Sequence, residues 1–116
     1  MESEEDGWTR HLPLKPYVAA IMAELANGPC HGYGLMIRLE GFKGGRGIGP
    51  ATLYRTLDQL TQEGWIQPTD NGETSSRRGA AYALTTSGRA VLSAEVARLE
   101  RWTREARTAL DPTVGG

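Results

Sequence analysis

The side chains best suited to chemistry in this sequence are arginines, and the partner they suit is nucleic acid. Arg77 and Arg78 stand side by side in a polar stretch that runs from residue 70 to 79. Two arginines at the tip of a loop suit a minor groove of DNA or the adjacent backbone. Lys43 and Arg46, in a glycine-rich stretch, could add contacts to phosphates. Taken alone, each of these groups could equally be a solvated surface.

Residues suited to catalysis or metal binding are few. The chain has one cysteine, Cys30, and two histidines, His11 and His31, which are far apart in the sequence. A zinc site needs a group of such ligands, and a hydrolase needs a nucleophile beside a base. The sequence offers neither grouping, and no paired carboxylates in a register suited to acid–base work. We therefore expect no enzyme activity, no metal and no cofactor.

The charge balance is almost neutral but uneven. The 116 residues carry 13 basic and 14 acidic side chains, and four of the acids lie in residues 1–6. Residues 7–116 therefore hold 13 bases against ten acids. The longest apolar run, residues 18–23, is far too short to cross a membrane. One cysteine cannot form an internal disulfide, and the N-terminus is acidic where a signal peptide is basic, so the membrane and secreted classes are disfavoured.

These candidate residues need elements that position them, and apolar residues at helical spacing predict the first two. One helix begins at Tyr17 and is ended by Asn27-Gly28-Pro29. Its apolar face carries Val18, Ile21, Met22 and Leu25. A second helix begins near His31, with an apolar face of Leu35, Leu39 and Phe42. Five glycines in residues 41–49 then indicate a loop, which lacks the residues of a phosphate-binding loop.

The third predicted helix is the one suited to lie in a groove of DNA. It begins at Pro50, which is favoured in a first helical turn, and Gly64 ends it. Its buried stripe is formed by Leu53, Leu57 and Leu60. Arg55 lies roughly opposite this stripe and could bridge guanine O6 and N7, while the Thr52 or Tyr54 hydroxyl could bond phosphates. Asp58 on the same face counts mildly against this interpretation, because it would repel phosphate.

Two short strands are predicted to follow this helix. They span residues 65–69 and 80–84, and a long polar hairpin loop joins them. Pro68 cannot donate to a neighbouring strand, which indicates an edge position. The alternation of Tyr82 and Leu84 predicts one buried face on the second strand.

The last predicted helix is long, with Thr85 as its cap and an end near Leu110. Its apolar residues repeat with the heptad spacing of a coiled coil and form a seam of Leu92, Val96, Leu99, Thr103, Ala106 and Leu110. A core this small cannot cover such a helix, so we expect the seam to meet another chain. The fold class is α+β, mainly α: a winged helix-turn-helix with a long C-terminal dimerisation helix. The expected parts are an acidic N-terminal tail (1–14), the winged helix-turn-helix domain (15–84), the dimerisation helix (85–111) and a short tail (112–116).

Several motifs together resemble the PadR-like family of transcriptional regulators. His31-Gly32-Tyr33 before an apolar helix resembles the family's His-Gly-Tyr signature. The family's pattern along the recognition helix, which is the helix that lies in the groove of DNA, is matched by Thr52-Leu53-Tyr54, Leu57, Leu60 and Glu63-Gly64-Trp65-Ile66. The hairpin and its exit into the last helix are represented by Arg77-Arg78, Tyr82-Ala83-Leu84-Thr85 and Gly88. Each fragment alone is weak, but their order over residues 17–92 makes the resemblance specific.

The resemblance implies a cytoplasmic homodimeric regulator, most often a repressor, that binds an inverted repeat in double-stranded DNA. On that basis the residues expected to contact DNA are Tyr33, Thr52, Tyr54, Arg77 and Arg78. A half-buried core position is the structural alternative for Tyr33. Arg55 departs from the family pattern, which often has proline after the tyrosine, so the target sequence cannot be taken from relatives.

The family also implies a small aromatic effector held between subunits. Trp102 lies one position from the seam, and Trp8 in the N-terminal tail could fold over it. Alternatively, both tryptophans only pack the dimer. A second function also remains open, because a winged-helix domain can serve as a protein-interaction module without binding DNA. Basic residues both on the third helix and on the hairpin favour DNA.

Overall fold

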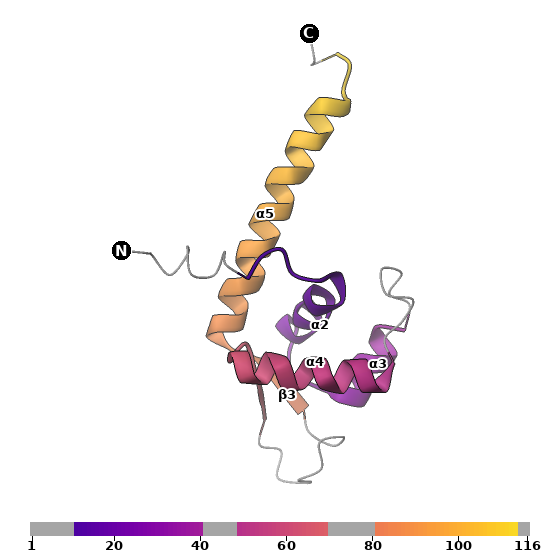
Figure 1. Ribbon diagram of the computed structural model, residues 1–116, viewed down its shortest axis with the longest axis vertical. Helices are drawn as coiled ribbons and strands as arrows, with labels where there is room; N and C mark the ends of the chain where they lie inside the picture. The colour runs from indigo at the N-terminus through magenta and orange to yellow at the C-terminus, as the bar shows by residue number, and fades with distance from the viewer. Residues whose placement is uncertain (1–10, 41–48, 70–80, 114–116) are drawn as a thin grey trace, which may run out of the picture.

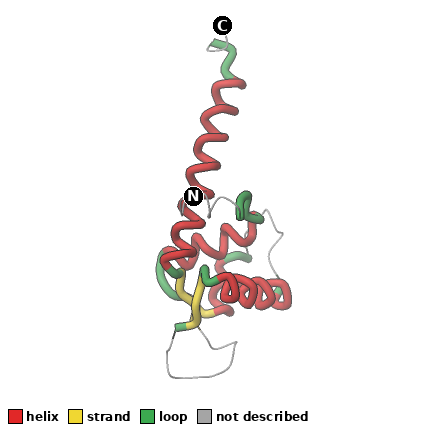
Figure 2. The backbone as a smooth tube through the Cα atoms, turned by 60° about the vertical axis from the view of Figure 1, so that its left-hand side comes forward, coloured by secondary structure: helices red, strands yellow, loops and turns green. Residues whose placement is uncertain are grey.

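The computed structural model describes residues 11–40, 49–69 and 81–113 (Figure 1). The helices in these ranges are α2 (Pro16–Ala26), α3 (Gly32–Arg38), α4 (Pro50–Glu63) and α5 (Thr86–Leu110). The strands are β1 (Cys30–His31), β2 (Ile66–Pro68) and β3 (Ala81–Leu84). α2 packs beside the lower part of α5, whereas α3 lies near the end of α4 that is farther from α5 (Figure 1). α5 runs well beyond these helices (Figures 1 and 2). The predicted fold class, mainly helical with a small antiparallel sheet, is confirmed.

The sheet has the strand order β1-β3-β2, with both pairings antiparallel. Cys30 is paired with Tyr82, and Ile66 with Leu84. β2 is an edge strand, as Pro68 predicted. β1 was not predicted, because two residues are too few to show an alternating pattern. The predicted alternation on β3 holds only in part: Ala81 is buried beside Tyr82, and Leu84 is half-buried, because this central strand is packed against both α2 and α5.

The core is built mainly from the apolar faces that helical spacing predicted. The residues that α2, α3, α4 and α5 bury completely or almost so are Ile21, Met22, Leu25, Leu35, Leu53, Leu57 and Val91. Val91 of α5 is an exception, because it is completely buried but lies beside the predicted seam and not in it. The second helix is shorter than predicted. α3 ends at Arg38, and the buried Leu39 is its C-cap, so the apolar spacing continues past the end of the helix. Phe42 lies outside the described residues.

Residues 11–14 were predicted to belong to a tail, but they pack on the domain. Leu14 is buried, and its backbone N–H donates a hydrogen bond to Oε2 of Glu95 on α5 (3.0 Å). The His11 ring meets the Trp65 ring edge-on, with the ring centroids 4.9 Å apart. The prediction failed here because Leu12 and Leu14 are too few to form a periodic pattern. Residues 1–10 lie outside the described residues.

Candidate nucleic-acid interface

The helix α4 has one face in the core and one face in solvent. Leu53, Leu57 and Leu60 are buried, as predicted. Thr56 is buried with them, because its hydroxyl donates to the backbone oxygen of Thr52 (2.7 Å) and needs no other partner. The opposite face is exposed at Thr52 and Arg55 and half-exposed at Asp58. The structure thus presents an arginine and a threonine near the N-terminal end of α4, as the sequence predicted.

Tyr54 lies between these two faces and rests on α3. A Cβ atom on Gly32 would come within 2.8 Å of Tyr54 Cε1 and 3.0 Å of its hydroxyl oxygen. The tyrosine ring therefore covers the backbone at the first residue of α3, where only glycine leaves room. Next to it, Tyr33 is 62% exposed, so the alternative of a half-buried core position for Tyr33 is wrong.

Two further residues of this surface were missed by sequence reasoning. Met36 and Pro50 line, together with Tyr33 and Tyr54, a hollow of about 380 Å³ between α3 and α4. Pro50 and Tyr54 are four residues apart and thus share one side of α4, which is the signal that could have found the pair. Met36 offers no such signal, because its position depends on how α3 crosses α4.

The strands β2 and β3 carry the predicted hairpin loop at one end of the sheet. The backbone N–H of Thr69 donates to the backbone oxygen of Ala81 (2.7 Å), so the chain leaves and re-enters the sheet at neighbouring positions. The arginines that the sequence placed in this loop, Arg77 and Arg78, lie outside the described residues. The same is true of Lys43 and Arg46 in the glycine-rich segment, so these four contacts stay predictions.

The end of α4 is fastened to the beginning of α5. Gly64 ends α4 in the left-handed conformation (φ 81°), and the Trp65 N–H reaches back to the backbone oxygen of Leu60 (3.0 Å). The Thr85 hydroxyl donates to the Gly64 backbone oxygen (2.6 Å) and accepts from the N–H of Gly88 (3.0 Å). Thr85 is therefore the predicted cap of α5 and also a link to α4.

Gly88 allows the backbones of α5 and of the segment after α4 to approach each other closely at this junction. A Cβ atom at this position would overlap the backbone carbonyl of Trp65 and approach Leu84 Cδ1 to 2.9 Å. Because backbone rather than a flexible side chain stands in the way, α5 can lie this near to the end of α4 only with glycine here. The orientation of the exposed face of α4 relative to α5 is thus fixed by the backbone.

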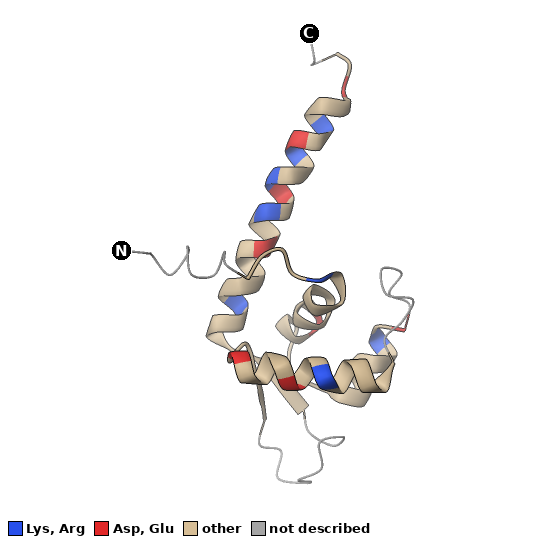
Figure 3. Cartoon of the chain, viewed as in Figure 1, with Lys and Arg blue, Asp and Glu red and all other residues tan. Residues whose placement is uncertain are grey.

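Beyond its first turns, α5 leaves the body of the protein and its apolar seam is uncovered. Leu92 is half-buried against the core and Ala106 is half-buried, whereas Thr103 is exposed. The exposed fractions at the other three seam positions are 45%, 43% and 81%, for Val96, Leu99 and Leu110 respectively. Acidic and basic residues are interspersed along the rest of the helix (Figure 3). The structure thus leaves the predicted seam of α5 largely exposed beyond Leu92.

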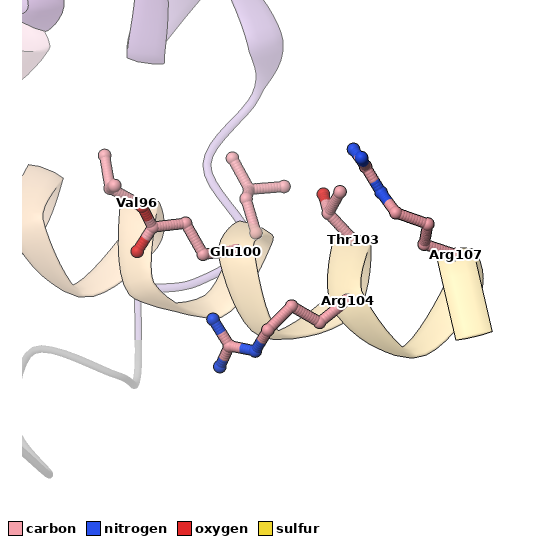
Figure 4. A pocket seen from close by; sticks show the side chains of 6 residues that line it. Val96, Glu100, Thr103, Arg104 and Arg107 are labelled. Carbon is pink, nitrogen blue, oxygen red and sulfur yellow. The ribbon is translucent and has the colours of Figure 1, made fainter.

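A shallow hollow of about 540 Å³ lies along this seam. The described residues that line it are Val96, Leu99, Glu100, Thr103, Arg104 and Arg107. Figure 4 shows Val96, Thr103 and Arg107 in a row on one side of α5. Trp102 is 62% exposed but is not among the lining residues, and Trp8 lies outside the described residues. The expected pairing of the two tryptophans at an effector site therefore stays a prediction.

One carboxylate is buried at the base of α5. Glu95 is only 3% exposed, and Arg98 donates to it from Nε (2.5 Å) and from its terminal nitrogen (3.1 Å). The hydrogen bonds from the Arg98 guanidinium outweigh the effect of burial and, with the bond from the Leu14 N–H, lower the pKa of Glu95. The residue is thus a charged anchor for the N-terminal segment.

The described residues contain no group of three histidine, cysteine or carboxylate side chains that could hold a metal, and no helix long and apolar enough to cross a membrane. Helices α3 and α4, followed by an antiparallel hairpin and a long exit helix, define a winged helix-turn-helix protein with an uncovered helix for association. The chain belongs to the PadR-like family of transcriptional regulators, whose family model matches residues 21–94. This is a family of regulators and not of enzymes, as expected from the sequence.

The chain is also similar to solved structures and to one curated relative. Bacillus subtilis PadR in complex with operator DNA is 26% identical, with a TM-score of 0.56 over 66% of this chain and 45% of that chain. RosR of H. salinarum is 25% identical, with a TM-score of 0.61 over 90% of this chain and 86% of that chain. An uncharacterised 37.1 kDa protein from a Streptomyces fradiae transposon is 31% identical over 81 residues, which are 70% of this chain and 22% of that protein. The chain thus spans about a fifth of the curated relative that it matches.

Proposed function

We propose that this protein is a homodimeric repressor that binds an inverted-repeat operator in double-stranded DNA. The observation that carries the proposal is the exposed face of α4, which presents Thr52 and Arg55 on a helix held rigidly against the core. In a helix-turn-helix protein this is the face that enters the major groove. The complex of B. subtilis PadR with operator DNA supports the same role for the related domain here.

The proposed contacts divide into base reading and positioning. Arg55 reads a base edge, since a guanidinium can pair with O6 and N7 of guanine. Thr52, Tyr33 and Tyr54 approach the backbone and the neighbouring bases. Contacts to phosphates and the minor groove come from Arg77, Arg78, Lys43 and Arg46. This division means that losing Arg55 changes the preferred sequence, whereas losing the loop arginines weakens binding to every sequence.

The dimer in this proposal is formed by α5. Val96 and Leu99 are exposed although both are large apolar residues, and they continue the spacing that begins at Leu92. A second copy of the helix would cover this seam, and a twofold pair of subunits requires a twofold pair of half-sites. An inverted repeat follows from that symmetry. A protein that covers an operator in this way excludes other proteins from it, and it would act in the cytoplasm, where the DNA is.

The test begins with DNA fragments of the source genome selected by the purified protein. Binding to a selected duplex is then measured by fluorescence anisotropy over a range of salt concentrations. Arg55→Ala should lower the affinity about tenfold or more, because a bidentate contact contributes about 1–3 kcal/mol. Replacing Arg77 and Arg78 with alanine should weaken binding and reduce the salt slope by about 0.9 for each phosphate that is no longer neutralised.

Arg101→Ala is the matched control, because it removes the same charge from an exposed position on α5. It should leave both affinity and salt slope nearly unchanged. A reporter gene placed behind the selected operator should be expressed less when the protein is present. Failure to bind any duplex at low ionic strength would contradict the proposal and favour a protein-interaction module.

We also infer a small aromatic effector that relieves repression at the α5 seam. The hollow beside Thr103 carries two arginines, Arg104 and Arg107, and the exposed Trp102 is one position away. An aromatic ligand should change the tryptophan fluorescence of the wild type and release the operator. Trp102→Phe should remove most of that fluorescence change, and Trp8→Phe should reduce it if the N-terminal tail folds over the ligand. If no aromatic ligand alters the fluorescence or releases DNA, the tryptophan only packs the dimer.

A further inference from the structure

The hollow between α3 and α4 is apolar and lies beside the proposed base-reading face. Its described lining residues are Tyr33, Met36, Pro50 and Tyr54, none of which carries a charge at neutral pH. Two of them come from the first turns of α3 and two from the first turns of α4 (Figure 1). Tyr54 and Arg55 are consecutive on α4, so the hollow and the guanidinium lie on adjacent sides of the helix, about 100° apart around its axis.

The walls of this hollow are held in place from behind. The Tyr54 ring rests on Gly32, where an added Cβ atom would displace the ring, and Met36 packs partly against the core. Tyr33 is 62% exposed and leaves the hollow open to solvent. The hollow is therefore an apolar surface that is already in place and open to solvent. Such a surface is unusual on a face that is proposed to bind DNA, which is a polyanion.

The chemistry of the lining residues indicates which chemical group of DNA the hollow can bind. The two tyrosine hydroxyls can donate hydrogen bonds to phosphates, whereas the rest of the lining, which is aromatic ring, thioether and proline ring, offers only apolar contact. The major groove presents hydrogen-bond donors, acceptors and a single apolar group, the C5-methyl of thymine. Aromatic, thioether and proline surfaces are suited to contact such a methyl group.

We propose that the hollow formed by Tyr33, Met36, Pro50 and Tyr54 receives the 5-methyl group of a thymine in each half of the operator. This rests on the proposed function, since it requires α4 to enter the major groove. The consequence is a second specificity element beside Arg55: the operator carries a thymine next to the base pair that the arginine reads.

The experiment replaces thymine by uracil, which keeps base pairing and removes only the methyl group. Affinities for the selected operator are compared between a duplex with thymine and one with deoxyuridine throughout. Burying a methyl group contributes about 0.8 kcal/mol, so the loss should be about fourfold per half-site and roughly 15-fold for a symmetric operator. Single substitutions should place the whole effect at one position in each half-site.

Two variants of Tyr33 test whether the hollow causes the difference in affinity between the thymine and uracil duplexes. Tyr33→Ala removes one wall at an exposed position and should make the affinities for the two duplexes nearly equal, whereas Tyr33→Phe should keep the difference. Arg55→Ala is the matched control: it should weaken binding to both duplexes and leave their ratio unchanged.

The outcomes separate the two proposals. If the wild type binds the thymine duplex and the uracil duplex equally well, the methyl proposal is wrong while DNA binding stands. A ratio that survives in Tyr33→Ala would also overturn it. If cytosines carrying a 5-methyl group restore affinity in the uracil duplex, the hollow binds the methyl group on either pyrimidine, which supports the methyl contact. Failure of the wild type to bind any duplex would refute the proposed function itself.

Discussion

The body of the protein and the outer half of α5 use the same apolar residue types in opposite ways. In the body, Leu53 and Leu57 of α4 are completely buried, and within the described ranges every buried side-chain nitrogen or oxygen has a hydrogen-bond partner. On α5, Val96 and Leu99 are nearly half exposed at equally regular spacing. Exposed apolar rows of this kind mark surfaces that associate with another chain. The body buries its apolar residues within one chain, whereas the proposed dimer would be needed to cover those of α5.

The two regions meet at a single rigid junction. Thr85 bonds to the end of α4 and caps α5, while Gly88 brings the two backbones into contact. In the proposed dimer, this junction would make the distance between the two α4 helices depend on how the two α5 helices pair. A change at the seam would therefore be transmitted to the spacing of the DNA-reading faces.

The largest effect is expected from a charge placed on the uncovered seam. Leu99→Glu should yield monomers without loss of the fold, because the residue is outside the core of the body. Since two half-sites are then no longer bound together, operator affinity should fall on the order of a thousandfold. Sedimentation and anisotropy measure the two effects. Ala97→Glu, exposed on the same helix but off the seam, should remain a dimer; if Leu99→Glu also sediments as a dimer, the subunits associate elsewhere.

The next largest effect concerns the junction itself. Gly88→Ala should lower the free energy of unfolding by about 3 kcal/mol, because the new Cβ overlaps the Trp65 carbonyl. Urea unfolding at a fixed protein concentration measures this. Gly49→Ala is the matched control, since a Cβ there meets no atom within 4 Å, and its cost should stay below about 1 kcal/mol. Equal costs at the two positions would show that the junction tolerates movement.

A smaller effect is expected at Thr85. Thr85→Ala removes the helix cap and the link to Gly64, and should cost about 1–2 kcal/mol. Thr85→Ser keeps the hydroxyl and should stay close to wild type in thermal and urea unfolding. Thr86→Ala tests the neighbouring exposed threonine, which should matter little. If serine fails to restore stability, the methyl group and not the hydroxyl fastens the junction.

Sequence reasoning succeeded where a feature repeats along the chain. The stripe of α4 and the seam of α5 each have several apolar residues at fixed spacing, so the spacing alone assigns the apolar face of each helix. Thr85 was predicted as a cap because it precedes such a pattern. The motifs carried the family resemblance for the same reason: they occur in a fixed order.

Prediction failed where a single contact between distant segments decides the structure. β1 has only two residues, and its pairing with β3 joins Cys30 to Tyr82 across the chain. The hollow between α3 and α4 needs Met36 beside Pro50, which no local spacing indicates. The anchoring of Leu14 by Glu95 joins residues 81 positions apart, and a lone glutamate on a charged helix gives no sign that it is buried.

The hydrogen bond between the Leu14 N–H and Glu95 gives the last and smallest predicted effect in the comparison of the body with the outer half of α5. Because the pKa of Glu95 is lowered in the folded protein, its carboxylate stabilises the fold at pH values above the ordinary glutamate pKa of about 4.3. The stabilisation is lost as the pH falls through the lower pKa of the folded state. Glu95→Gln should therefore cost about 1 kcal/mol in urea unfolding at neutral pH, and this difference should shrink in acid.

Glu105→Gln is the control, because Glu105 is exposed on the outer half of α5, and it should change the unfolding free energy little at either pH. If Glu95→Gln lowers the free energy of unfolding by the same amount at neutral and at acidic pH, the packing of the side chain and not its charge keeps Leu14 in place. A cost that shrinks in acid would show that the N-terminal segment is held by a carboxylate on the first half of α5. The first half of the helix would then belong to the closed body, and only the seam beyond it would need a second chain.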